Sequence, residues 1–134
     1  MIISPAGDQV LLTLHRRIGR WLQTGGHIES DDHGVRAAAL REATEESGLA
    51  GIGLGDLLVL SRHEVPCGPI DTGALVRPTF HLDLQFLALA DPSRPTAVSD
   101  ESDDVRWFGV DALPDVDGSV RRLVAAARSA IADA

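Results

Sequence analysis

The stretch TFHLDLQFLALA, residues 79–90, most limits what this chain can fold into. Its apolar residues Phe80, Leu82, Leu84 and Phe86 alternate with polar ones, which is the period of a strand with one apolar face. Such a strand needs partner strands beside it and a covering layer over its apolar side. The chain is therefore expected to build a sheet.

Further strands are expected at residues 9–15, 20–23, 56–65 and 105–110, which are short, apolar and bounded by turn residues. Residues 35–47 predict a helix that is rich in alanine, with Asp31 or Asp32 as its N-cap and Gly48 as a left-handed C-cap.

The end of the chain predicts a second helix, capped by Asp117 or Ser119. Its apolar stripe consists of Val120, Leu123, Val124, Ala127 and Ile131. One early and one late helix among several strands predict an α/β (α+β) domain, in which a mixed sheet carries packed helices.

Composition narrows the function. A chain of 134 residues with 44% hydrophobic residues suits one domain over residues 1–134. A net charge of −8, with twelve arginines and no lysine, argues against binding of long nucleic acid. No apolar run is long enough to cross a membrane, and the N-terminus lacks the pattern of a secretory signal. The single cysteine, Cys67, cannot form an internal disulfide and is interpreted as a filler, so a cytoplasmic location is predicted.

Three glutamates, Glu42, Glu45 and Glu46, share one side of the first predicted helix near its C-terminal end. Like charges at this spacing repel, and the helix dipole adds to the cost. Taken alone, they suggest a solvated acidic face. The upstream Gly25-Gly26 turn, however, lets a backbone carbonyl approach closely. Carboxylate and carbonyl oxygens suit Mg²⁺, which would offset the repulsion and polarise a phosphoryl oxygen.

At these residues the chain resembles the Nudix family, whose box reads G-x5-E-x7-R-E-U-x-E-E-x-G-U, with U a bulky aliphatic residue. The leading glycine is matched by Gly26, and the second half of the box is matched by Arg41, Glu42, Glu45, Glu46, Gly48 and Leu49. Ala43 is smaller than the usual residue at its U position. The resemblance implies an α/β/α sandwich with a mixed sheet between helices.

The chain departs from the family pattern in three places. The box is one residue longer in the loop before the helix, which puts Asp32 at the first acidic position. Gln23-Thr24 precede the glycines, where Leu-Pro is usual. Only the residues MII precede the first turn, SPAGD. The N-terminal strand is therefore expected to be short or truncated, or another chain completes the sheet edge.

The resemblance implies hydrolysis of a diphosphate linkage in a nucleoside diphosphate joined to a group X, by attack of water at phosphorus. The cofactor would be Mg²⁺, with Mn²⁺ as an alternative. Glu42 and Glu46 would bind it directly, and Glu45 would bind a second metal or act through water. The Gly26 carbonyl would complete the shell, and Arg41 would orient a glutamate.

Other roles are assigned by position. The acidic loop SDESDD supplies the candidate general base, Glu101 first and Asp104 second. Substrate contacts are expected from His27 and Arg20, and from His81 and Asp83 if the polar face of their strand looks into the cleft. The expected partner is a small nucleotide-type molecule, and a homodimer is a further possibility.

Three alternatives stay open. A Nudix-fold binding module without turnover usually lacks box glutamates, whereas all three are present here. Isopentenyl diphosphate isomerase shares the fold, but it needs a cysteine and a glutamate at an allylic carbon, and Cys67 is the one cysteine of the chain. An acidic α/β domain with a solvated glutamate face would show no stabilisation by Mg²⁺.

Overall fold

In the computed structural model, residues 1–65 and 79–134 are described. The strands are β1 (Ile2–Ile3), β2 (Gln9–His15), β3 (Trp21–Leu22), β4 (Gly53–Val65), β5 (Thr79–Leu89) and β6 (Ser102–Gly109), and the helices are α1 (Val35–Ser47) and α2 (Gly118–Ala132). Every expected element is present, with ends that differ by a few residues. In the described ranges, no helix is long and apolar enough to span a membrane.

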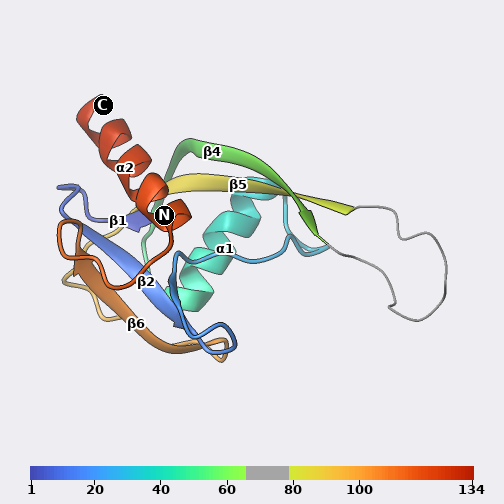
Figure 1. Cartoon of the computed structure of the whole chain (residues 1–134), viewed down its shortest axis with the longest axis horizontal. Helices are drawn as coiled ribbons and strands as arrows, with labels where there is room; N and C mark the ends of the chain where they lie inside the picture. The colour runs from blue at the N-terminus through green and yellow to red at the C-terminus, as the bar shows by residue number, and fades with distance from the viewer. Residues whose placement is uncertain (66–78) are drawn as a thin grey trace.

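The strands form one mixed sheet in the order β3-β2-β1-β5-β4, and β6 also pairs with β2 (Figure 1). β1 runs parallel to β5, and the other pairs are antiparallel. The prediction of a short first strand is confirmed, because β1 has two residues. It pairs with Ala88 and Leu89 of β5, so the earlier part of β5 has no strand of this sheet between itself and β3. The cleft described below lies at this gap.

Each face of the sheet has its own apolar core. Ile3, Val10 and Leu12 pack with α2 residues such as Val120 and Leu123. On the other face, β-strand residues pack with Ala43 of α1 and with Leu49; they include Ile2, Leu11, Ala88 and Val105. Alternate residues of β1 and β2 thus point to opposite helices, as the period of a strand requires. This arrangement confirms the sandwich of a mixed sheet between helices.

The predicted end of α1 is confirmed. Gly48 adopts φ 69°, and its N–H donates to the carbonyl of Thr44 at 2.8 Å. An added Cβ at Gly48 would lie 2.6 Å from the Cβ of Ala97, so both the left-handed backbone and the close packing require glycine.

The predicted N-cap of α1 is wrong. Gly34 occupies the N-cap position, and no side chain caps this end. Neither Asp31 nor Asp32 serves, because Asp32 accepts hydrogen bonds from Arg41 and from the Glu29 N–H instead. At α2 the prediction holds, since Asp117 accepts from the N–H groups of Ser119 and Val120.

The apolar face of β5 is only partly covered. Phe86 is buried and stacks under Arg36, whereas Leu82 is 63% exposed. On β4, Leu60 is also 63% exposed. Figure 1 shows the reason: β4 and β5 run side by side beyond the end of α1, so the helix covers only their inner part. Alternation predicted the strand correctly, but not how much of it a neighbour would cover.

Candidate active site

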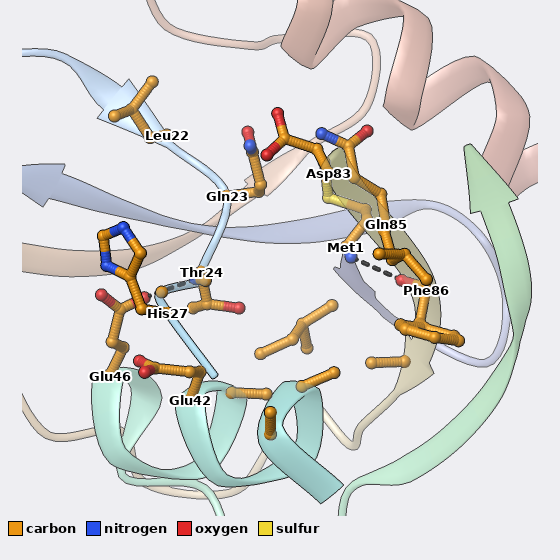
Figure 2. A pocket seen from close by; sticks show the side chains of 18 of the residues that line it. Met1, Leu22, Gln23, Thr24, His27, Glu42, Glu46, Asp83, Gln85 and Phe86 are labelled. Atoms are coloured by element: carbon orange, nitrogen blue, oxygen red, sulfur yellow. Dashed lines mark hydrogen bonds between the residues drawn. The ribbon is translucent and has the colours of Figure 1, made fainter. Parts of the chain in front are cut away.

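Helix α1 presents two of its glutamates to a cleft. Ala38 and Ala43 are buried against the sheet, and these small side chains let the helix pack closely. Glu42 and Glu46 are four residues apart, so they lie one above the other on the same side of the helix. Figure 2 shows both pointing into the cleft, beside the loop that carries Thr24 and His27.

Arg41 organises the start of this site. Its Nε and Nη2 donate to the two carboxylate oxygens of Asp32, both at 2.9 Å, and Nη1 donates to Glu42 at 2.9 Å and to Glu45 at 3.2 Å. Nη2 also donates to the carbonyl oxygen of His27 at 3.0 Å. A guanidinium has five N–H donors, so this set occupies them all. The prediction that Arg41 orients a glutamate agrees with this geometry.

The same contacts explain how the longer loop is accommodated. The forked pair with Arg41, followed by the N–H of Glu29, holds the pKa of Asp32 down at about 2. In return, the hydrogen bonds to Asp32, and then to Glu42, raise the pKa of Arg41 above its ordinary value. Glu29 lies 3.6 Å from Arg41 as an outer partner. The acid at the first box position thus reaches Arg41 despite one extra residue and a shorter side chain.

Glu46 is the most buried acid of the site, with 7% of its surface exposed. Its Oε2 accepts a hydrogen bond from the Gly25 N–H at 2.8 Å. Burial raises the pKa of Glu46 to about 7, against the Gly25 hydrogen bond, and the charges of Glu42, Glu101 and Glu45 raise it further. When ionised, the Glu46 carboxylate therefore carries a charge that has no cation partner among the described residues.

Gly26 leaves room for the carboxylate of Glu42. A Cβ there would overlap the carboxylate of Glu42, so the backbone of the loop lies directly against that side chain. In the part of the chain that the structure describes, no three His, Cys, Asp or Glu side chains gather closely enough to hold a metal ion by themselves. Glu42, Glu46 and the backbone of Gly26 nevertheless supply hard oxygen donors, and with the unbalanced charge of Glu46 they fit a cation such as Mg²⁺.

The remaining predicted acids differ in exposure and in their partners. Glu45 is 60% exposed and is held at the rim by Arg41, so it does not line the cleft with Glu42 and Glu46. Glu101, just before β6, is exposed and lies near enough for its charge to act on Glu46. Asp104 is paired with Arg106 at 2.6 Å.

The cleft has a volume of about 580 Å³, within the range that small-molecule sites occupy. His27, His81 and Asp83 line it, as do Leu82, Leu84 and Phe86, so side chains from both faces of β5 contribute to the lining. The rings of His27 and His81 meet edge to face at 5.9 Å between centroids. Arg20 is exposed in the hairpin turn before β3 and does not line the cleft.

Sequence reasoning gave no role to Gln23 and Thr24, which both line the cleft. The Oε1 atom of Gln23 is buried, and it has no hydrogen-bond partner among the described residues. The signal was their departure from the usual Leu-Pro before the glycines, because a polar pair there points to a polar cleft wall. Apolar side chains, among them Ile28, Val35 and Leu84, form another part of the lining, here called the apolar wall.

One expectation falls on residues 66–78, outside the described ranges. It is the interpretation of Cys67 as a filler, and with it the cysteine that the isomerase alternative requires.

Comparison with known proteins supports the resemblance. A family model described as the NUDIX domain matches residues 1–130. The crystal structure of a NUDIX-family hydrolase from Clostridium perfringens is 24% identical, with a TM-score of 0.65, over 98% of this chain and 91% of that one. A C. elegans Ap4A hydrolase in a binary complex is 16% identical, with a TM-score of 0.67, over 99% of this chain and 96% of that one. None of the curated proteins matches the chain significantly.

Proposed function

The chain belongs to the Nudix family and is a Nudix-type pyrophosphohydrolase; from this premise we propose that it hydrolyses the diphosphate linkage of a nucleoside diphosphate–X compound with the aid of Mg²⁺ or Mn²⁺. The observation that carries the proposal is the pair of glutamates, Glu42 and Glu46, that face one cleft beside the backbone of Gly26. A nucleotide as substrate is supported by the C. elegans structural neighbour, which is an Ap4A hydrolase.

Glu42, Glu46 and the Gly26 carbonyl would hold the cation. When bound, such a cation polarises a phosphoryl oxygen and makes a water molecule a better nucleophile. Arg41 keeps Glu42 oriented by the 2.9 Å hydrogen bond, so the carboxylate loses little freedom on binding. Glu45, also held by Arg41, stays at the rim, where it would act through water or on a second cation.

Glu101 is our choice for the general base. Its charge acts on Glu46 across the site, and among the described residues its carboxylate has no ion-pair partner, whereas that of Asp104 is paired with Arg106. It would accept a proton from the attacking water as the oxygen bonds to phosphorus and the bridging P–O bond breaks. The products would be a nucleoside monophosphate and the phosphate of X.

The biological setting is part of the same proposal. We take residues 1–134 as one catalytic domain that works in the cytoplasm on a small substrate, without long nucleic acid or membrane. A homodimer is supported by β4, which ends the sheet order and carries exposed Leu57 and Leu60.

The test compares the parent with Glu46→Gln on a panel of nucleotides and nucleotide-sugars at slightly alkaline pH. We expect Mg²⁺-dependent cleavage by the parent and a loss of at least about a hundredfold in kcat/KM for Glu46→Gln. Glu64→Gln, which removes an exposed glutamate outside the cleft, should remain active. An active Glu46→Gln protein would refute the assigned ligand, and nucleotide binding without product would refute hydrolysis.

A further inference from the structure

We propose that the cleft selects nucleoside diphosphates whose group X is an uncharged, hydroxyl-bearing moiety such as a sugar, and that it disfavours longer phosphate chains. This inference rests on the proposed function and names the substrate class of the same site. Three observations carry it: the charge of the cleft wall, the engagement of the nearby arginines, and a cluster of hydrogen-bond acceptors opposite the glutamates.

The cleft wall is short of positive charge. Its acids are Glu42, Glu46 and Asp83, and none of the described lining residues is an arginine. The chain has no lysine. Each further phosphate brings at least about one more negative charge. Bound cations at the glutamates would serve a diphosphate, but a longer chain would extend toward Asp83 without a counter-charge.

Four of the described arginines already have partners. Arg41 uses its five donors on Asp32, Glu42, Glu45 and the His27 carbonyl. Arg36 donates to the carbonyl oxygens of Gly55 and Leu54. Arg16 is paired with Asp103 at 2.8 Å, and Arg106 with Asp104 at 2.6 Å. Recruiting Arg41 for an extra phosphate would leave its part-buried acceptors unpaired, which is costly, whereas the exposed pairs of Arg16 and Arg106 are weaker.

The far side of the cleft offers acceptors instead. Figure 2 shows the side chains of Gln23, Asp83 and Gln85 gathered between β3 and β5, across the cleft from Glu42 and Glu46. The buried Oε1 of Gln23 lacks a hydrogen-bond partner among the described residues. Asp83 directs Oδ2 to His63 at 3.3 Å, which leaves Oδ1 for another donor. These carboxylate and amide oxygens are satisfied by hydroxyl or amino donors, which phosphate oxygens lack, whereas the amide nitrogens of Gln23 and Gln85 can also donate.

The groups proposed for the diphosphate and for the group X lie in one cavity. The glutamates of α1 and the acceptors of β3 and β5 line the same cleft of about 580 Å³. A diphosphate held at the glutamates would present the hydroxyls of X to Gln23 and Asp83. The apolar wall with Ile28, Val35 and Leu84 is then left for the base, whose flat faces are apolar.

The experiment measures kcat/KM for ADP-glucose, ATP and diadenosine tetraphosphate, which share one base, at saturating Mg²⁺. We expect ADP-glucose to exceed both polyphosphates by at least about tenfold. Gln23→Leu should raise KM for ADP-glucose by at least about fivefold with kcat unchanged, because it removes uniform binding. Asp83→Asn should raise kcat/KM for the tetraphosphate, and so narrow the ratio of kcat/KM between ADP-glucose and the tetraphosphate. Asp111→Asn, at a side chain 92% exposed, is the matched control for charge and should leave the ratio unchanged.

A tetraphosphate cleaved as efficiently as ADP-glucose, or a ratio that Asp83→Asn does not move, would overturn the inference. No cleavage of any compound would instead count against the proposed function. In that case calorimetric binding of the same three compounds decides the inference separately. Tighter binding of ADP-glucose would support selection by the acceptor cluster, and tighter binding of the tetraphosphate would refute it.

Discussion

Replacing Glu46 by glutamine should stabilise the metal-free protein at alkaline pH while it abolishes activity. Burial, and then the neighbouring carboxylates, raise the pKa of Glu46 from its ordinary 4.5 to about 7. Below the lower value the carboxyl is protonated in the folded and the unfolded chain alike. Between the two values the folded protein keeps a proton that the unfolded chain has released, so the free energy of unfolding falls as pH rises. Above about pH 7 the decrease in the free energy of unfolding is complete and stays constant.

The size of the effect follows from this displacement. Each tenfold change in proton affinity is worth about 1.4 kcal/mol, which sets an upper limit of about 3 kcal/mol for Glu46. Part of the carboxylate reaches solvent in the cleft, and screening there lowers the expected effect to roughly 1–2 kcal/mol. For a chain of this length that corresponds to about 3–8 °C in Tm. Glutamine keeps the shape and still accepts from the Gly25 N–H, so packing should change little.

The assay is denaturant unfolding of the parent and Glu46→Gln from pH 4.5 to 8, in the presence of a chelator. The difference between the two proteins should be near zero at the acidic end and should grow with pH in favour of the variant. Glu64→Gln is the control and should follow the parent. Adding Mg²⁺ at pH 8 should stabilise the parent more than the variant, since only the parent keeps the ligand. A difference that stays flat across this pH range would refute the reasoning.

Three further changes test other parts of the site. Gly26→Ala should keep the fold but displace Glu42, and kcat/KM should fall by about 10–100-fold because the carboxylate loses its position. Arg41→Lys keeps the charge but not the fork to Asp32, so Mg²⁺ activation should weaken by about 10–100-fold; full activity would show that the fork is dispensable. Asp117→Ala removes the cap of α2, and it should lower the free energy of unfolding by about 1 kcal/mol in urea titration without changing kcat/KM; a loss of activity at unchanged stability would contradict this.

Local patterns in the sequence predicted most of the fold. Alternation predicted β5, and the glycine after Ser47 predicted the end of α1, because both depend on backbone preferences of adjacent residues. The N-cap of α1 was mispredicted for a tertiary reason. Asp32 has the right chemistry for a cap, but a guanidinium nine residues further along the chain offers it two stronger hydrogen bonds.

The part of the site that lies within the Nudix box was predictable from the sequence. Glu42, Glu46 and Gly26 lie together because helical spacing and one turn bring them together. The opposite wall of the cleft was not predictable in the same way, because Gln23 and Asp83 are distant in sequence and meet only through the gap that the short β1 leaves in the sheet. Arg20 shows the converse, since it was expected to contact the substrate but lies exposed in the turn, outside the cleft lining.

The electrostatic cost of placing three glutamates on one helix differs between Glu42, Glu45 and Glu46. Arg41 contacts Glu45 and one oxygen of Glu42, both within 3.2 Å, and it also contacts Asp32, so one positive charge is shared by three carboxylates. Glu46 receives only a backbone N–H, and it remains the group whose charge burial penalises. The burial cost is therefore largest at Glu46, where a bound cation relieves it most. A substitution that removes this penalty also removes the oxygen ligand, so stability and activity oppose each other at Glu46.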